Sequence, residues 1–84
     1  MDNNLLRALH EEQGRRKIKE LARKIDVTKY NIEAAEDIIS HTPSNAQRDK
    51  LTQKNNQRRH AVGALQKEIQ DIEQTMAERE RERS

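Results

Sequence analysis

Residues 18–39 read IKELARKIDVTKYNIEAAEDII, and the spacing of their apolar and small side chains decides the fold. These side chains recur in steps of three and four residues, at Ile18, Leu21, Ile25, Thr28, Ile32, Ala35 and Ile39. The pattern is a heptad repeat in which isoleucine fills each a position and Leu21 begins the d series. The stretch therefore predicts a helix with one narrow apolar seam.

A second heptad series lies in residues 51–76, LTQKNNQRRHAVGALQKEIQDIEQTM. Its seam positions are Leu51, Asn55, Arg58, Val62, Leu65, Ile69, Ile72 and Met76. Two of them are polar, with Asn55 at an a position and Arg58 at a d position. A buried Asn at such a position weakens the seam but fixes its register. We expect this polar layer to align the two helices.

The segment between the two series, Ser40-His41-Thr42-Pro43-Ser44-Asn45, contains the only proline of the chain. Thr42 and Pro43 fit the N-cap and first position of a new helix, whereas Ser44 with Gln47 fits a capping box. Because the connection is short, the helices must be antiparallel neighbours. The predicted fold is all-α, a two-helix antiparallel coiled-coil hairpin. Its expected parts are a helix over about 5–40, a turn at 41–45, a helix over about 46–78 and a frayed charged tail at 79–84.

Antiparallel pairing brings together residues whose numbers sum to about 86. The predicted neighbours are Ala35 with Leu51, Asn55 with Ile32, Arg58 with Thr28, Ile25 with Val62, Leu21 with Leu65 and Ile18 with Ile69. The segment before residue 18 departs from this order, because Leu5, Leu6 and Leu9 are out of phase with the seam and Gly14 occupies a d position. Glycine inside a helix costs about 1 kcal/mol relative to alanine. We expect a kink, a fray or a break at Gly14.

The predicted seam is thin. Hydrophobic residues make up 31% of the 84-residue chain, Tyr30 is the one aromatic, and cysteine is absent. Fixing a residue costs on the order of 1.5 kcal/mol, whereas burying an aliphatic side chain returns about 1.5–3 kcal/mol. We therefore expect the hairpin to be marginal alone, or to dimerise into a four-helix bundle. The expected partner is a second copy or another helical protein.

Charge and hydropathy restrict the classes of partner. Charged residues make up 38% of the chain, but 17 basic and 15 acidic side chains give a net charge of only +2. A protein built to coat DNA carries a stronger positive field, so we expect weak or no binding to nucleic acid. No apolar run reaches the roughly 18 residues needed to cross a bilayer, and no secretory signal opens the sequence, which favours an intracellular protein without a membrane partner.

The sequence predicts no catalytic, cofactor-binding or metal-binding residues, and hence no enzyme. His10, His41 and His60 are scattered, and no histidine completes the Glu-x-x-His spacing of a helical-bundle metal site. The clusters are Glu11-Glu12, Glu33-Glu36-Asp37 and Glu68-Asp71-Glu73. Two basic runs, Arg15-Arg16-Lys17 and Arg58-Arg59-His60, are candidates for phosphate contacts. They lack interleaved aromatics, and solvated helix faces are the favoured interpretation.

Several motifs resemble the small acid-soluble spore protein Tlp family. They are Ile18-x-x-Leu21, Ile25-Asp26-x-Thr28 and Asn31-Ile32-Glu33-x-Ala35-Glu36 before the turn, and Lys54-Asn55, Arg58-Arg59 and Glu68-Ile69-Gln70-Asp71 after it. The resemblance covers about residues 18–73. It implies a small protein of the forespore, located in the spore core, with a structural or storage role, no catalysis and no cofactor.

A second resemblance leads to a different class of function. Arg23-Lys24-Ile25, Ile32-x-Ala34-Ala35 and the series from Leu51 to Ile72 are similar to the hairpins that bind Rho-type GTPases in protein-kinase-C-related kinases. That resemblance implies a cytoplasmic binding module of the Rho-effector type. A generic coiled-coil oligomerisation module is the third possibility.

Overall fold

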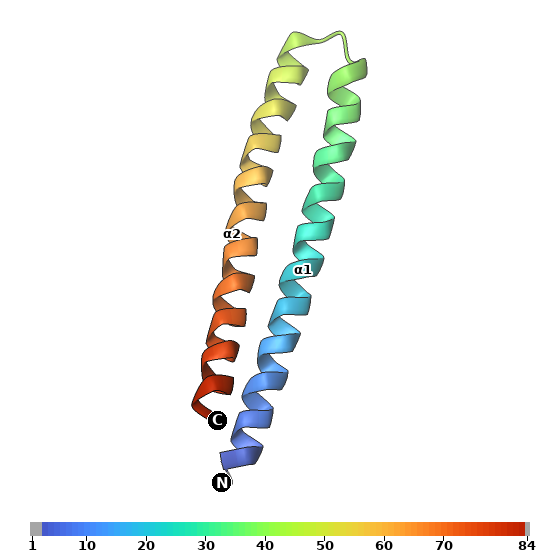
Figure 1. The fold of residues 1–84 in the computed structure, drawn as a ribbon. Helices are drawn as coiled ribbons and strands as arrows, with labels where there is room; N and C mark the ends of the chain where they lie inside the picture. The colour runs from blue at the N-terminus through green and yellow to red at the C-terminus, as the bar shows by residue number, and fades with distance from the viewer. Residues whose placement is uncertain (1–2, 84) are drawn as a thin grey trace.

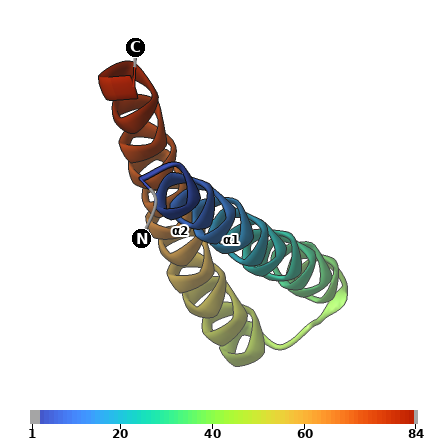
Figure 2. The same ribbon diagram turned by 90° about the horizontal axis from the view of Figure 1, so that it is seen from below.

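The computed structural model describes residues 3–83, which form two long helices joined by a short turn. Helix α1 spans Asn3–His41 and helix α2 spans Asn45–Arg83, and they run antiparallel with both ends of the chain at the same end of the molecule (Figure 1). The rod measures 63 × 15 × 15 Å. Seen along its length, the two helix axes are inclined to each other (Figure 2). The predicted two-helix antiparallel hairpin is confirmed, and the described residues contain no strand.

Both helices extend further than the sequence predicted. Helix α1 begins at Asn3 rather than near residue 5, and the turn is limited to residues 42–44 rather than 41–45. Helix α2 continues through Arg83 instead of ending near residue 78, because alternating Glu and Arg are good helix formers even without an apolar face. Fraying of this tail in solution stays a prediction, and Ser84 lies outside the described residues.

The turn is closed by backbone and side-chain hydrogen bonds. The Thr42 amide donates to the Ile38 carbonyl at 2.9 Å and extends the last turn of α1. The Gln47 amide donates to the Ser44 hydroxyl at 3.2 Å, so Ser44 and not Thr42 is the N-cap of α2. The reciprocal bond of a capping box does not form, because the Ser44 amide lies 3.4 Å from the Thr42 hydroxyl. The Thr42 hydroxyl donates to Oε1 of Gln47 at 3.1 Å, and Nη2 of Arg48 donates to the Thr42 carbonyl at 3.0 Å.

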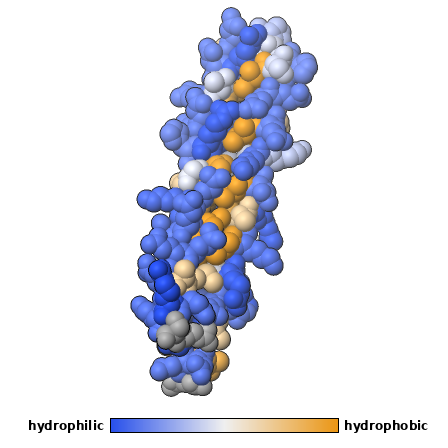
Figure 3. Space-filling model, viewed as in Figure 1, coloured by the Kyte–Doolittle hydropathy of each residue, from blue (hydrophilic) through white to orange (hydrophobic). Residues whose placement is uncertain are grey.

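The predicted seam positions form the contact between the helices. Every residue of the two heptad series is buried or half-buried. The five most buried residues are Leu21, Ile25, Ala35, Asn55 and Val62. Apolar patches follow one another along the groove between the helices and are bordered by polar side chains on both sides (Figure 3). The apolar contact is thus one stripe wide, and most of its residues keep some access to solvent.

Helix α1 continues without interruption through Gly14, so the predicted break is absent from the described residues. A Cβ atom at this position would lie 2.9 Å from Sδ of Met76 and 3.7 Å from Cγ2 of Ile72. The absence of a side chain lets Met76 pack directly against the backbone of α1. Packing across the seam therefore explains the glycine, and the d position assigned to it is correct.

Candidate functional site

The polar layer of the seam is fully hydrogen-bonded. Asn55 has 1% of its surface exposed, and its Nδ2 donates to the Ile32 backbone carbonyl of the opposite helix at 3.1 Å. Its Oδ1 accepts a hydrogen bond from Nη1 of Arg58 at 2.8 Å. The contact with Ile32 confirms the register predicted from the sequence. A satisfied buried amide of this kind disfavours slipped alignments, because each of them would leave it without partners.

The predicted neighbour of Arg58 on α1 makes its own bond elsewhere. The Thr28 hydroxyl donates to the Lys24 carbonyl of the preceding helical turn at 2.7 Å. Arg58 is half-buried and directs its guanidinium to Asn55. The alignment of the two helices at this level therefore depends on the Asn55 amide and not on a bond between Arg58 and Thr28.

The first basic run, Arg15-Arg16-Lys17, faces carboxylates of its own helix. Each of the three cations has an acidic partner three or four residues away, a spacing that places side chains on one helix face. The pairs are Arg15 with Glu11 at 4.0 Å, Arg16 with Glu12 at 2.8 Å and Lys17 with Glu20 at 3.9 Å. The charge of the run is therefore partly balanced by carboxylates of the same helix surface.

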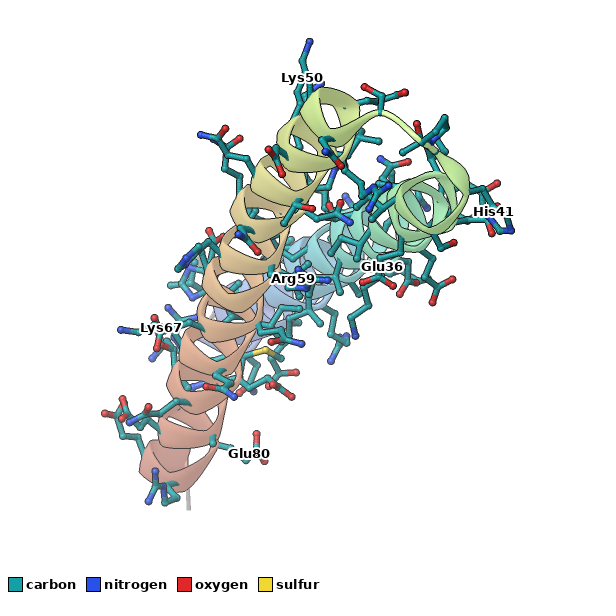
Figure 4. All side chains as sticks on the ribbon, turned by 90° about the horizontal axis from the view of Figure 1, so that it is seen from above. Glu36, His41, Lys50, Arg59, Lys67 and Glu80 are labelled. Carbon is teal, nitrogen blue, oxygen red and sulfur yellow. The ribbon has the colours of Figure 1, made fainter. Side chains whose placement is uncertain are left out.

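The second basic run contains an ion pair that crosses between the helices. Nη2 of Arg59 lies 2.5 Å from Oε1 of Glu36, and the two side chains point toward each other from α2 and α1 (Figure 4). Both side chains remain about half exposed, at 51% and 53%, so the pair contributes at most about 1 kcal/mol. Its main effect is to occupy the one arginine of the run that would otherwise be available to an anion.

The charges of the hairpin are divided into four alternating segments. Residues 3–24 carry seven basic and three acidic side chains, whereas residues 26–41 carry one basic and four acidic. In α2 the order is the same, with six basic and one acidic side chain in residues 45–67, then three basic and six acidic in residues 68–83. The antiparallel arrangement places each basic segment beside an acidic one. Most of the basic charge therefore has a nearby counter-charge within the same molecule.

One cluster has the residue types of a catalytic triad but not its geometry. At the end of α1, Nδ1 of His41 lies 3.1 Å from the Ser40 hydroxyl and 3.6 Å from Oδ1 of Asp37. In a triad, the serine hydroxyl and the carboxylate contact different ring nitrogens of the histidine. One nitrogen accepts the serine proton, and the N–H of the other donates a hydrogen bond to the carboxylate. Here both approach the same nitrogen. The C-terminus of a helix also presents carbonyl groups and no amide donors for an oxyanion.

The other candidate chemical groups are not gathered into a site. A shallow groove at the open end of the hairpin has His10, Lys17, Asp71 and Met76 on its walls, and the hydroxyl of nearby Thr75 donates to the Asp71 carbonyl at 3.0 Å. Within residues 3–83, no group of three or more His, Asp or Glu side chains is placed to hold a metal ion. Neither described helix has the length and apolarity needed to cross a membrane.

The outer faces of the two helices differ in a way that was not predicted from the sequence. Among the described residues, the large hydrophobic side chains that remain exposed all belong to α1: Leu5, Leu6, Leu9, Val27, Tyr30 and Ile38. The first three are the patch that the sequence analysis recognised as out of phase. The other three lie at c, f and g positions of the same heptad. Their spacing could have indicated a second apolar face on this helix.

A comparison with family models gives one match. The model described as "Small, acid-soluble spore protein Tlp" matches residues 10–80, which include nearly all of both helices and the turn. No curated protein and no solved structure is significantly similar to the chain. The match agrees with the first of the two resemblances in the sequence, and the resemblance to GTPase-binding hairpins gains no support.

Proposed function

Because the chain belongs to the small, acid-soluble spore protein Tlp family, we propose that it is a non-enzymatic structural or storage protein of the spore. The observation that carries the proposal is the extent of the family match, residues 10–80, which covers the hairpin as a whole and not an isolated heptad stretch. The spore core is the expected location within the spore.

The physical properties of the hairpin suit a protein that is kept in a dormant cell and then removed. The chain has no cysteine, so no disulfide can form in it during dormancy. Within residues 3–83 four apolar side chains are buried, and a contact this thin opens readily. A protease that cleaves the open form would clear the protein once the cell is rehydrated.

The distribution of charge supports a role other than coating DNA. The basic run at Arg15–Lys17 is paired with carboxylates, and Arg59 is paired with Glu36. These four cations are engaged within the molecule, and a net charge of only +2 gives little attraction to a polyanion, so binding should be weak and lost as salt increases. We expect the protein to bind duplex DNA weakly or not at all at physiological salt.

Immunoblots of the sporulating host cell test the proposed function directly. We expect the protein in the forespore and in the core fraction of the mature spore, and its absence from vegetative cells. A decline soon after germination would favour storage, and persistence would favour a structural role. Equal amounts in vegetative cells would contradict the proposal. Selective capture of the chain by a GTP-loaded Rho-type GTPase, relative to the GDP-loaded form, would also contradict it.

A further inference from the structure

The outer face of α1 carries an apolar stripe that does not contact α2. Val27 and Tyr30 are 57% and 71% exposed, Ile38 is 46% exposed, and Ala34 is also exposed. At about 100° per residue, the four side chains fall within about 100° of arc on the side of α1 away from the seam. Their steps of three, four and four residues repeat the spacing of a helix-packing surface.

The outer face of α2 offers no comparable surface. Its c and f positions are polar or charged except for one alanine. In order they are Lys50, Gln53, Gln57, His60, Ala64, Lys67, Asp71, Gln74, Glu78 and Arg81. Two of them, Lys50 and Lys67, point away from the hairpin in Figure 4. A helical partner that buries apolar surface would therefore use α1.

The flanking charges identify the occupant. On the helix surface, Arg23, Tyr30 and Asp37 are spaced seven residues apart and therefore lie in line. Arg23 forms no ion pair with any described side chain, and Asp37 has only the exposed His41 3.6 Å away. When two such stripes are placed antiparallel about Tyr30, Arg23 of each copy lies opposite Asp37 of the other. Val27 of each copy then lies opposite Ala34.

We propose that the outer face of α1 is a self-association surface, on which α1 of a second copy of this chain packs antiparallel about a two-fold axis at Tyr30. The alternating charge of α1 favours this direction. The end of its basic segment, residues 19–24, lies opposite the end of the acidic segment, residues 36–41, of the other copy, whereas a parallel pair would place like charges together. The arrangement is isologous and closes at two copies.

The interface is small. Residues 20–41 extend for roughly 30 Å at about 1.5 Å per residue, and a contact of this length belongs to the low end of specific interfaces. Sedimentation of the full chain from about 5 µM to about 1 mM spans the affinities expected of such contacts. We expect monomer at the lower limit and dimer at the upper limit. Monomer throughout this range would overturn the proposal.

Tyr30→Glu replaces the central aromatic with a charge and leaves the seam untouched. We expect it to raise the dimer dissociation constant at least about tenfold, as the loss of a central anchor does. Gln53→Glu, at the equivalent outward position of α2, is the matched control and should change the constant less than about twofold. Circular dichroism verifies that both variants remain helical. Equal effects of the two substitutions would overturn the proposal.

Charge exchange tests the antiparallel direction. Arg23→Asp alone places carboxylates opposite each other, Asp37→Arg alone places guanidinium groups opposite each other, and both single changes should weaken the dimer. The double variant Arg23→Asp/Asp37→Arg restores opposite pairs, and its dissociation constant should return to within about threefold of the original. A parallel dimer, or one formed through another face, would show no recovery, and that result would overturn the proposal.

A single thiol tests the position of the two-fold axis. The natural chain has no cysteine, so Asn31→Cys, beside Tyr30 on the same surface, introduces the sole thiol. Mild oxidation at dimer-forming concentration should link two copies, while Gln53→Cys under the same conditions should stay largely unlinked. Preferential linking through Gln53→Cys would place the contact on α2 and overturn the proposal.

Discussion

Asn55 illustrates how a single residue can limit the stability of the hairpin while defining its alignment. Its amide is almost completely buried and bonds to the Ile32 carbonyl across the seam and to Arg58 within α2. The carbonyl of Ile32 also has its own helical hydrogen-bond partner, so losing the amide leaves no acceptor stranded. The net contribution of such a buried polar group to stability is therefore smaller than that of an aliphatic side chain of similar size.

The double variant Asn55→Ile/Arg58→Leu should raise the melting temperature, because two polar side chains in the seam are replaced by apolar ones that each gain about 1.5–3 kcal/mol on full burial. The register of the two helices and the number of chains that associate should both become less well defined. Thermal denaturation followed by circular dichroism measures the first effect and sedimentation the second. Asn55→Ala alone, which leaves a gap beside Arg58, should lower the melting temperature. A lower melting temperature for the double variant would show that the polar layer is net stabilising.

The two glycines provide a matched pair of substitutions. A Cβ atom at Gly63 would meet nothing within 4 Å, so Gly63→Ala should stabilise the hairpin by about 1 kcal/mol through helix propensity alone. Gly14→Ala should stabilise it by less, because the new methyl group displaces the Met76 thioether. Urea denaturation of both variants measures the difference. An equal gain at the two positions would show that Met76 moves aside at no cost.

At the scale of the secondary-structure element, the start of α2 depends on one side chain. The Ser44 hydroxyl accepts a hydrogen bond from the Gln47 amide at 3.2 Å, and the Arg48 amide lies 3.0 Å from the Ser44 carbonyl as the first helical bond. Four amides at a helix N-terminus lack partners within the helix, and the cap satisfies one of them. Because the turn consists only of residues 42–44, few other groups lie near enough to accept hydrogen bonds from these amides.

Ser44→Ala should destabilise the hairpin by about 1 kcal/mol, the usual loss when an N-cap is removed. Ser44→Asp is the control, since a carboxylate caps equally well and also favours the positive end of the helix dipole. Chemical denaturation gives the stability, and hydrogen exchange at Gln47 locates the effect. An unchanged exchange rate at Gln47 in Ser44→Ala would mean that water caps the helix adequately.

The elements also show which parts of the fold could be predicted from the sequence. The heptad spacing predicted the seam positions correctly. A helix that packs against one neighbouring helix needs apolar residues at regular intervals, and these intervals are visible in a single sequence. The role of Gly14 could not be predicted, because it depends on where Met76 of the other helix packs. The sequence predicted a frayed tail after about residue 78, because no apolar face continues beyond Met76, whereas α2 extends to Arg83 on helix propensity alone. The absence of a predicted catalytic or metal site rests on residue types and stays a prediction.

At the scale of the whole molecule, the four charged segments connect the fold with its surroundings. Each helix is basic toward its N-terminus and acidic toward its C-terminus, which is unfavourable for the helix dipole. Antiparallel packing compensates by setting each segment beside its opposite. We therefore expect attraction between exposed charges of opposite segments to stabilise the hairpin, an interaction that dissolved salt screens.

Raising NaCl from about 20 mM to about 1 M, where the screening length falls to about 3 Å, should lower the melting temperature by a few degrees. Circular dichroism melts across this range provide the measurement. Gly63→Ala is a suitable control, because it should shift every melting temperature upward without altering the dependence on salt. A melting temperature that rises steadily with NaCl would show that apolar burial outweighs the charged segments.

The position of the two chain ends has a mechanical consequence. Both ends of the described chain lie together, and the turn is at the far end of a 63 Å rod (Figure 1). A force that separates the ends therefore peels the helices apart one layer at a time, with the contact of Met76 on Gly14 among the early ones, instead of shearing all layers at once. The first layers to part are half-buried, and the hydrogen-bonded Asn55 layer lies far along the path. Such a rod resists little when its ends are pulled apart and much more when it is pulled from end to turn, so the direction of loading decides whether it opens.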